Sequence, residues 1–221
     1  MGKMIYVPTA GAQSWQALLA DPTKQWPTGY SARTLAHCWE AAEGLPPEIA
    51  ALFGSDTELL IAIPEHKVSL RDTGRESQTD VFALVKSSNR TIAVAVEGKV
   101  NESFGPTISD WYVDASLRKQ QRLAFLCELI GTECPPPGDI HYQLFHRAAS
   151  AILEADRFKT DDAAMIVHSF AQDRRGFDAY AAFLDLFELA AEAGKLVSKT
   201  LPHGRTIHFG WAQGDPRFLS L

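Results

Sequence analysis

Two apolar runs joined by a short polar break are the feature that most constrains how this chain can fold. The runs span residues 79–86 and 91–99, and residues 87–90 between them are polar. Runs rich in β-branched and aromatic residues are typical of strands, while Ser and Asn are typical of turns. The sequence therefore predicts an antiparallel hairpin with its turn centred on Ser88 and Asn89.

The predicted turn fixes which residues face each other across the hairpin. Asp80 falls opposite Glu97, and apolar residues such as Phe82 and Ala95 also face each other. Directly opposed residues project from the same side of a sheet with Cβ atoms roughly 4.5–5.5 Å apart, and the alternation of side chains puts Lys99 on that side too. A slip of one residue would turn every side chain of one strand to the wrong face. We therefore expect two carboxylates and one ammonium group to converge at one end of the hairpin.

Two carboxylates that face each other on a half-buried sheet need a compensating charge, because direct opposition of like charges destabilises a sheet and burial adds to the cost. A divalent cation such as Mg²⁺ or Mn²⁺ would compensate Asp80 and Glu97, since both ions take hard oxygen ligands. Lys99 could then orient or help deprotonate a metal-bound water, or stabilise charge on a phosphorane-like transition state. An ordinary ion cluster at the end of a sheet is the alternative, and the spacing alone does not separate the two.

The other apolar patterns predict helices and strands around this hairpin. Both faces of the hairpin are largely apolar, so we expect helices on both sides of the sheet. The order of elements is that of an α/β fold with a mixed sheet that contains an antiparallel three-strand meander. The expected helices span residues 31–42, with Ser31 as N-cap, 110–130, 141–158 and 176–193, and the further strands span 58–69, 163–170 and 206–211.

Asp80 starts the second predicted strand, and Glu97, Gly98 and Lys99 end the third. With a helix before the meander and another after it, this pattern resembles the PD-(D/E)XK phosphodiesterase superfamily, which has the restriction-endonuclease-like fold. The core of that superfamily is a helix, a three-strand meander, a helix and a further strand. One departure is Thr79, which stands where the name-giving proline would be, and that proline has no chemical role.

The resemblance covers about residues 31–170, in which residues 163–170 would be the further strand. A length of 221 residues fits one elaborated domain. The resemblance therefore implies a single domain over 1–221, with a C-terminal helix–strand extension of the core over 171–221.

In that superfamily the Asp and Glu bind the metal ion, the carbonyl between Glu and Lys often joins them, and the Lys assists the attacking water. Carried over to this sequence, the implied metal ligands are Asp80, Glu97 and the carbonyl of Gly98, and Lys99 is the implied catalytic lysine. Many members add an acidic ligand from the first helix, where this chain has Glu40. Glu40 points away from the apolar stripe of its helix, so an exposed position is the alternative.

The helix predicted over residues 110–130 offers groups for substrate binding. Gln120 and Gln121 border its apolar stripe and resemble the superfamily's auxiliary glutamine, which positions a substrate phosphate or the catalytic lysine. Arg118 and Arg122 could add phosphate contacts, although exposed charges on helices are mostly solvated.

Composition narrows the classes of protein and partner. The net charge is −6, which disfavours nonspecific coating of nucleic acid, because such affinity comes from Lys and Arg at phosphates. The cysteines Cys38, Cys127 and Cys134 are too few for a disulfide framework and have no zinc-ligand spacing with histidines. His168 lies in an apolar run and is interpreted as a hydrogen-bonded core histidine. No signal peptide or membrane-spanning run is visible, so we expect a cytoplasmic protein without a membrane partner.

The sequence as a whole predicts a metal-dependent phosphodiesterase, a nuclease that hydrolyses DNA or RNA with a metal-activated water. Nucleic acid is the expected partner, and a homodimer is left open. The alternative is a noncatalytic binding or assembly module that keeps the fold. A hydrolase that acts on another phosphate ester is a third hypothesis, whereas the usual motifs for dinucleotides and ATP are absent.

Overall fold

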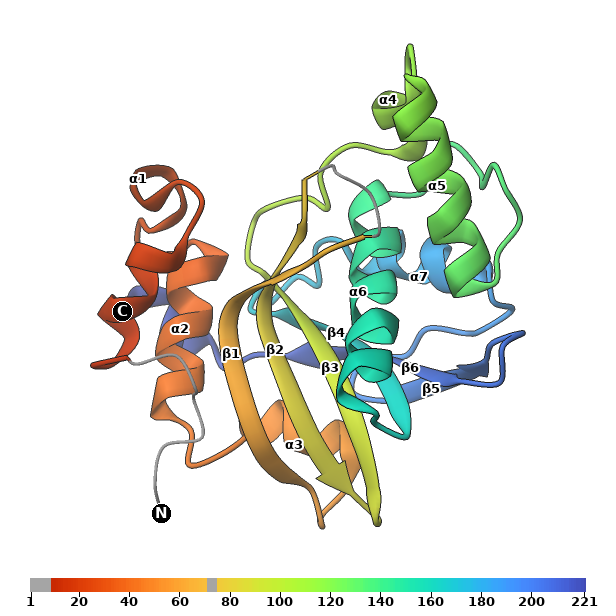
Figure 1. Cartoon of the computed structure of the whole chain (residues 1–221). Helices are drawn as coiled ribbons and strands as arrows, with labels where there is room; N and C mark the ends of the chain where they lie inside the picture. Colours follow the sequence, from red (N-terminus) through yellow and green to blue (C-terminus); the bar gives the residue numbers. More distant parts are fainter. Residues whose placement is uncertain (1–8, 71–74) are drawn as a thin grey trace.

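A mixed β-sheet organises the described residues, 9–70 and 75–221, in this computed structural model (Figure 1). Its six strands lie in the order β1-β2-β3-β4-β6-β5. The first three strands form an antiparallel meander, β4 and β6 run parallel to β3, and β5 is an antiparallel edge strand. The strands are β1 (Glu58–Val68), β2 (Ser77–Ser87), β3 (Arg90–Lys99), β4 (Asp162–Ser169), β5 (Leu196–Thr200) and β6 (Thr206–Gln213). The predicted α/β class, mixed sheet and meander are therefore confirmed.

The hairpin of β2 and β3 has the register that the sequence predicts. Val81 pairs with Val96, and Phe82 pairs with Ala95. Ser88 and Asn89 form the turn with φ of 48° and 65°. Left-handed backbone at both central positions matches the right-handed twist of the flanking strands, which is why such turns are favoured in hairpins.

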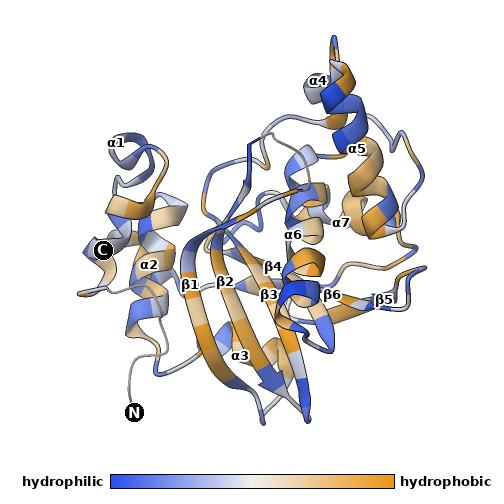
Figure 2. Cartoon of the chain, in the orientation of Figure 1, coloured by the Kyte–Doolittle hydropathy of each residue, from blue (hydrophilic) through white to orange (hydrophobic). Residues whose placement is uncertain are grey.

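Helices cover both faces of the sheet, and the strands between them are largely apolar (Figures 1 and 2). Alternate residues of β2 and β3 enter two separate cores: Phe82 and Ala95 pack with residues of α5, α6 and α7. Val81 and Val96 pack with residues of α2 and α3 on the other face. The helices are α1 (Pro22–Gln25), α2 (Ser31–Ala41), α3 (Pro47–Phe53), α4 (Ile108–Tyr112), α5 (Leu117–Ile130), α6 (Tyr142–Phe158) and α7 (Phe177–Asp185), with 3₁₀ turns η1 (Ala12–Leu18) and η2 (Pro216–Ser220).

Three details of the helices differ from the prediction. The N-cap of α2 is Tyr30, not Ser31. The backbone N–H of Ser31 in the first turn of α2 donates to the Glu102 carboxylate at 2.8 Å. The single helix predicted over 110–130 is α4 and α5, because the chain turns at Asp114 (φ 49°) and Ser116 caps α5 anew. The predicted helix 176–193 ends at Asp185 in α7.

The C-terminal part of the chain takes part in the same sheet. β6 pairs with β4, so it lies inside the sheet, and β5 was not predicted. β5 is short and partly exposed along its length, so its sequence lacks a clear apolar alternation. No helix among the described residues combines the length and apolar character needed to cross a membrane.

Candidate functional site

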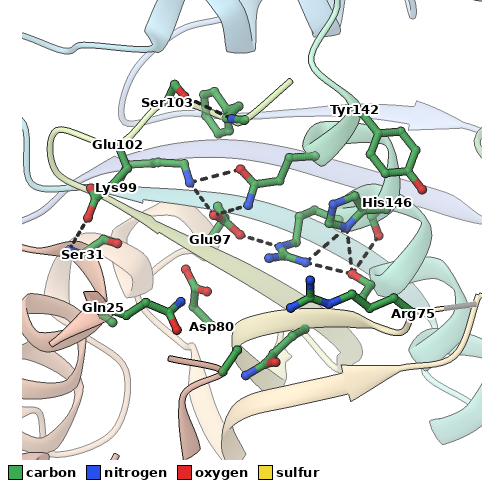
Figure 3. Close-up of a pocket in the computed structure, with 18 of the residues that line it drawn as sticks. Gln25, Ser31, Arg75, Asp80, Glu97, Lys99, Glu102, Ser103, Tyr142 and His146 are labelled. Carbon is green, nitrogen blue, oxygen red and sulfur yellow. Dashed lines mark hydrogen bonds and ion pairs between the residues drawn. The ribbon is translucent and has the colours of Figure 1, made fainter. Parts of the chain in front are cut away.

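A cavity of about 620 Å³ lies at the end of the meander, where β1, β2 and β3 approach α6 (Figure 3). Glu65 of β1, Asp80 of β2, Glu97 and Lys99 of β3, and Arg147 of α6 line it. The two acids that the predicted register places opposite each other therefore share one cavity with Lys99.

Glu97 is the most heavily bonded acid of the cavity, and its side chain is only 4% exposed. Its Oε1 accepts from Lys99 Nζ at 2.5 Å and from Gln143 Nε2 at 2.8 Å, and its Oε2 accepts from Arg147 Nε at 2.5 Å. Burial would raise the pKa of Glu97, but the charges of Arg147 and Lys99 outweigh it and hold that pKa at about 2. Glu97 therefore stays ionised well below neutral pH.

Asp80 contacts β3 through its side chain instead of through ladder pairing. Its Oδ2 accepts from the backbone N–H of Gly98 at 2.7 Å. A Cβ at position 98 would lie 3.4 Å from that oxygen and 3.3 Å from Leu35 Cδ2, so a glycine allows this close approach. Burial, together with the negative charge of Glu97, raises the pKa of Asp80 to about 7.

Glu65 is a third carboxylate that the sequence interpretation missed. It lies between Pro64, which pairs with Val81, and His66, which pairs with Thr79, so it falls opposite Asp80. Burial and the charge of Asp80 raise the pKa of Glu65 to about 9, and Gln78 Nε2 donates to its Oε2 at 2.8 Å. The register of β1 against β2 is set across the long connection between them, which has no turn motif to count from.

The α6 residues Gln143 and Arg147 were also missed. They are four residues apart, so they lie on the same side of the helix and both reach Glu97. Arg147 Nη1 also donates to Ser77 Oγ at 2.8 Å, which fixes the guanidinium between two strands. A detectable signal was present, because Arg147 sits beside Leu144 and Ala148 within the apolar stripe of α6.

The predicted residues Glu40 and Gly98 do not line this cavity. The Glu40 carboxylate accepts from Thr9 Oγ1 at 2.7 Å and from Trp15 Nε1 at 2.9 Å, which makes it a structural acceptor on α2. The structure therefore does not bring Glu40 to the other predicted metal ligands, and it shows the N–H of Gly98 rather than its carbonyl engaged by Asp80.

Of the residues predicted for substrate binding, Arg118, Gln120 and Gln121 are exposed on α5 and do not line the cavity. Gln120 Nε2 instead donates to Ala115 O at 2.9 Å. Arg122, one turn further along α5, does line the cavity. Of the two arginines considered for phosphate contacts, Arg122 therefore lines the cavity and Arg118 does not.

Basic and aromatic side chains border the acidic end of the cavity. Lys24, Arg75 and Arg122 line it, and the Arg75 side chain projects into it in Figure 3. Trp111 and Tyr142 also line it and stack on each other with ring centroids 3.9 Å apart. The site can thus offer oxygen ligands to a cation and positive charge to an anion at the same time.

Comparison with known proteins gives a family but no activity. A family profile described as "Domain of unknown function (DUF6946)" matches residues 8–216. The chain belongs to the DUF6946 family. No curated protein and no solved structure matches it. The DUF6946 match contains every residue that lines the cavity, so the cavity is part of the family domain.

Proposed function

We propose that this DUF6946 chain is a metal-dependent phosphodiesterase, a nuclease with a restriction-endonuclease-like core. The observation that carries the proposal is the row of three carboxylates, buried Glu97 and partly buried Glu65 and Asp80, on adjacent strands beside Lys99 in one cavity. The order of elements supports such a core, because α2 precedes the meander and β4, which runs parallel to β3, follows α6.

Mg²⁺ or Mn²⁺ fits this donor set, with Asp80, Glu97 and Glu65 as oxygen ligands. If all three carboxylates were ionised, they would outnumber the two cations, Lys99 and Arg147, that are bonded to Glu97. Burial, and after it the negative charge of the neighbouring carboxylates, raise the pKa values of Asp80 and Glu65, so ionising both groups leaves an excess negative charge in the cavity. A bound divalent ion would offset it, lower the pKa of a coordinated water and polarise a phosphoryl oxygen.

The side chains around the carboxylates have separate tasks. Arg147 and Gln143 hold the Glu97 carboxylate in one orientation. Lys99 Nζ, which bonds both Glu97 Oε1 and Gln143 Oε1, places an ammonium group where negative charge develops on a phosphoryl oxygen. In the proposed hydrolysis a water oxygen bonds to phosphorus as the phosphorus–ester oxygen bond breaks, and the ester oxygen leaves with the proton that the attacking water gives up.

The basic residues at the border of the cavity supply substrate affinity. Lys24, Arg75 and Arg122 can bind the phosphates next to the scissile one. The chain as a whole has a net charge of −6, so nucleic acid would be attracted to this cavity and not to the surface in general.

The proposal is tested by metal calorimetry and cleavage assays on the same protein samples. We expect wild-type protein to bind Mn²⁺ and to cut at least one member of a panel of single- and double-stranded DNA and RNA. Lys99→Ala should reduce the rate at least 100-fold, and Asp80→Asn should reduce both Mn²⁺ affinity and rate, with circular dichroism unchanged. Glu40→Gln is the matched acidic control, because Glu40 lies outside the cavity, and it should retain Mn²⁺ binding and cleavage. Absence of both Mn²⁺ binding and cleavage in the wild type would refute the proposal.

A noncatalytic binding module is the second candidate, favoured by one observation. Glu97 already accepts from Lys99, Arg147 and Gln143, so its charge is balanced by the protein alone. This candidate predicts nucleic-acid binding that needs no Mn²⁺, weakens on Arg75→Ala or Arg122→Ala, and is never followed by cleavage.

A further inference from the structure

A second cluster of potential metal ligands lies on the face of the sheet that α2 and α3 cover, opposite to the face from which Glu97 and Lys99 project. It consists of Cys38 of α2, Glu48 of α3 and His168 of β4, whose ligand atoms all lie within 4.8 Å of one another. Val167 belongs to the core beneath α5, α6 and α7, so the alternation along β4 turns His168 towards α2 and α3. The chain positions of these residues are far apart, which is why the sequence shows no zinc-ligand spacing.

The side chains of Cys38 and His168 both approach the same oxygen of Glu48. His168 Nε2 lies 2.8 Å from Glu48 Oε1, and Cys38 Sγ lies 3.6 Å from the same oxygen. Cys38 is 3% exposed and His168 is 0% exposed, so two of the three are inside the protein. Nδ1 of His168 is also buried and has no hydrogen-bond partner among the described residues. The sequence predicts a hydrogen-bonded core histidine here, and His168 is hydrogen-bonded through only one of its two ring nitrogens.

The chemistry of this cluster differs from that of the cavity. A thiol sulfur, an imidazole nitrogen and a carboxylate oxygen are ligands that zinc accepts in tetrahedral sites, whereas Mg²⁺ and Mn²⁺ prefer oxygen alone. Ligand atoms of one tetrahedral zinc ion lie roughly 3.3–3.8 Å apart, so a small adjustment of these side chains makes room for an ion. The Glu48 side chain is 18% exposed, which leaves one direction open to water as a fourth ligand.

Charge balance also favours zinc. A thiolate at Cys38 and a carboxylate at Glu48 together neutralise a divalent ion, and the His168 imidazole adds none, so the buried site would carry no net charge. The surrounding residues are mainly apolar, since Cys38 is part of the core formed with Leu35, Trp39 and other residues of that face. A neutral metal site is compatible with such an environment, while an isolated thiolate is not.

We propose that Cys38, Glu48 and His168 bind one zinc ion that joins α2 and α3 to β4. His168 pairs with Gly98 on β3, so this zinc site lies directly behind the carboxylate cavity, across the sheet. With three protein ligands and water as the fourth, the site has the ligand number of an open zinc site, and the ion would hold two helices against the strand next to the one that carries Glu97 and Lys99. The proposal does not depend on nuclease activity.

The test is a titration of the metal-free full-length chain with Co²⁺, followed by displacement with Zn²⁺. We expect one equivalent of Co²⁺ to give a thiolate-to-cobalt charge-transfer absorption and the visible bands of tetrahedral cobalt, both of which Zn²⁺ removes. Cys38→Ser should lose the charge-transfer absorption. Cys127→Ser is the matched control, because Cys127 is equally buried in the other core, and it should retain the spectrum.

Two further variants separate this site from the cavity and from misfolding. Glu48→Gln, at the partly exposed ligand, should weaken Zn²⁺ binding at least tenfold while the thiolate band persists. Asp80→Asn should leave Zn²⁺ affinity unchanged, so failure of the nuclease proposal would not affect this result. Wild-type protein without a thiolate band, or a band that survives in folded Cys38→Ser, would overturn the zinc assignment.

Discussion

The carboxyl groups of the cavity differ from one another for reasons that act residue by residue. Glu97 has a pKa of about 2 because two cations outweigh its burial, whereas Asp80 and Glu65 have pKa values of about 7 and 9 because burial and neighbouring negative charge act together. The three acids therefore affect stability with opposite signs.

The raised pKa values predict that stability falls as pH rises. Above about pH 5 the folded chain keeps protons that the unfolded chain has released, on Asp80 up to about pH 7 and on Glu65 up to about pH 9, and each retained proton contributes about 1.4 kcal/mol per pH unit to the slope. Urea denaturation should show this decline in wild-type protein up to about pH 7 for Asp80 and up to about pH 9 for Glu65. Asp80→Asn with Glu65→Gln should flatten it, and a wild-type curve already as flat as that of the double variant would contradict the assignment.

Glu97 acts in the reverse direction. Its lowered pKa contributes stability above about pH 4 that is lost as the pH falls towards about 2. Acid denaturation of the Lys99→Met variant should therefore begin at a higher pH than that of the wild-type protein, because one of the two cations that stabilise ionised Glu97 is gone.

Replacing Arg147 removes one of the two cations that contact the buried carboxylate of Glu97. We expect Arg147→Met to lower the free energy of unfolding by about 3–5 kcal/mol, the usual cost of breaking a buried ion pair from one side. Arg118→Met, an exposed arginine on α5, should change it by less than about 0.5 kcal/mol. Chemical denaturation of both variants measures the difference, and equal effects would show that the Arg147–Glu97 contact does not stabilise the fold.

The strand pairing that the sequence predicts correctly is the one that depends on residues close together in the chain. The register of β2 and β3 follows from a turn at Ser88 and Asn89, because a tight turn leaves one pairing that keeps apolar residues together. Sequence reasoning failed at Glu65 and Arg147, because their positions depend on how distant elements pack. The register of β1 is not encoded by a nearby motif, and the apolar stripe of α6 indicates that Arg147 is buried but not that Glu97 is its partner.

The hairpin turn itself is open to test. Asn89 has φ of 65°, where β-branched residues are disfavoured by about 1–2 kcal/mol. Asn89→Val should therefore destabilise the chain by about that amount in thermal or urea denaturation. Lys86→Val places the same side chain at an exposed strand position and should cost less. A larger loss for Lys86→Val would mean that the turn does not set the register.

For the whole molecule, the central sheet separates two sets of polar groups. Glu97 and Lys99 contact Gln143 and Arg147 of α6, while the Cys38, Glu48 and His168 cluster lies among α2, α3 and β4. β3 and β4 connect the two, since Gly98 pairs with His168 between them. Helices on both faces thus turn a mixed sheet into a scaffold that keeps hard oxygen ligands apart from a thiol and an imidazole.

The most direct test of the central claim is anomalous X-ray scattering from crystals of the full chain soaked in Mn²⁺. We predict an anomalous difference peak within coordination distance of the carboxylates of Asp80 and Glu97, which disappears in Asp80→Asn crystals. A fully soaked wild-type crystal with Lys99 and Arg147 still on Glu97 and no peak in the cavity would contradict it.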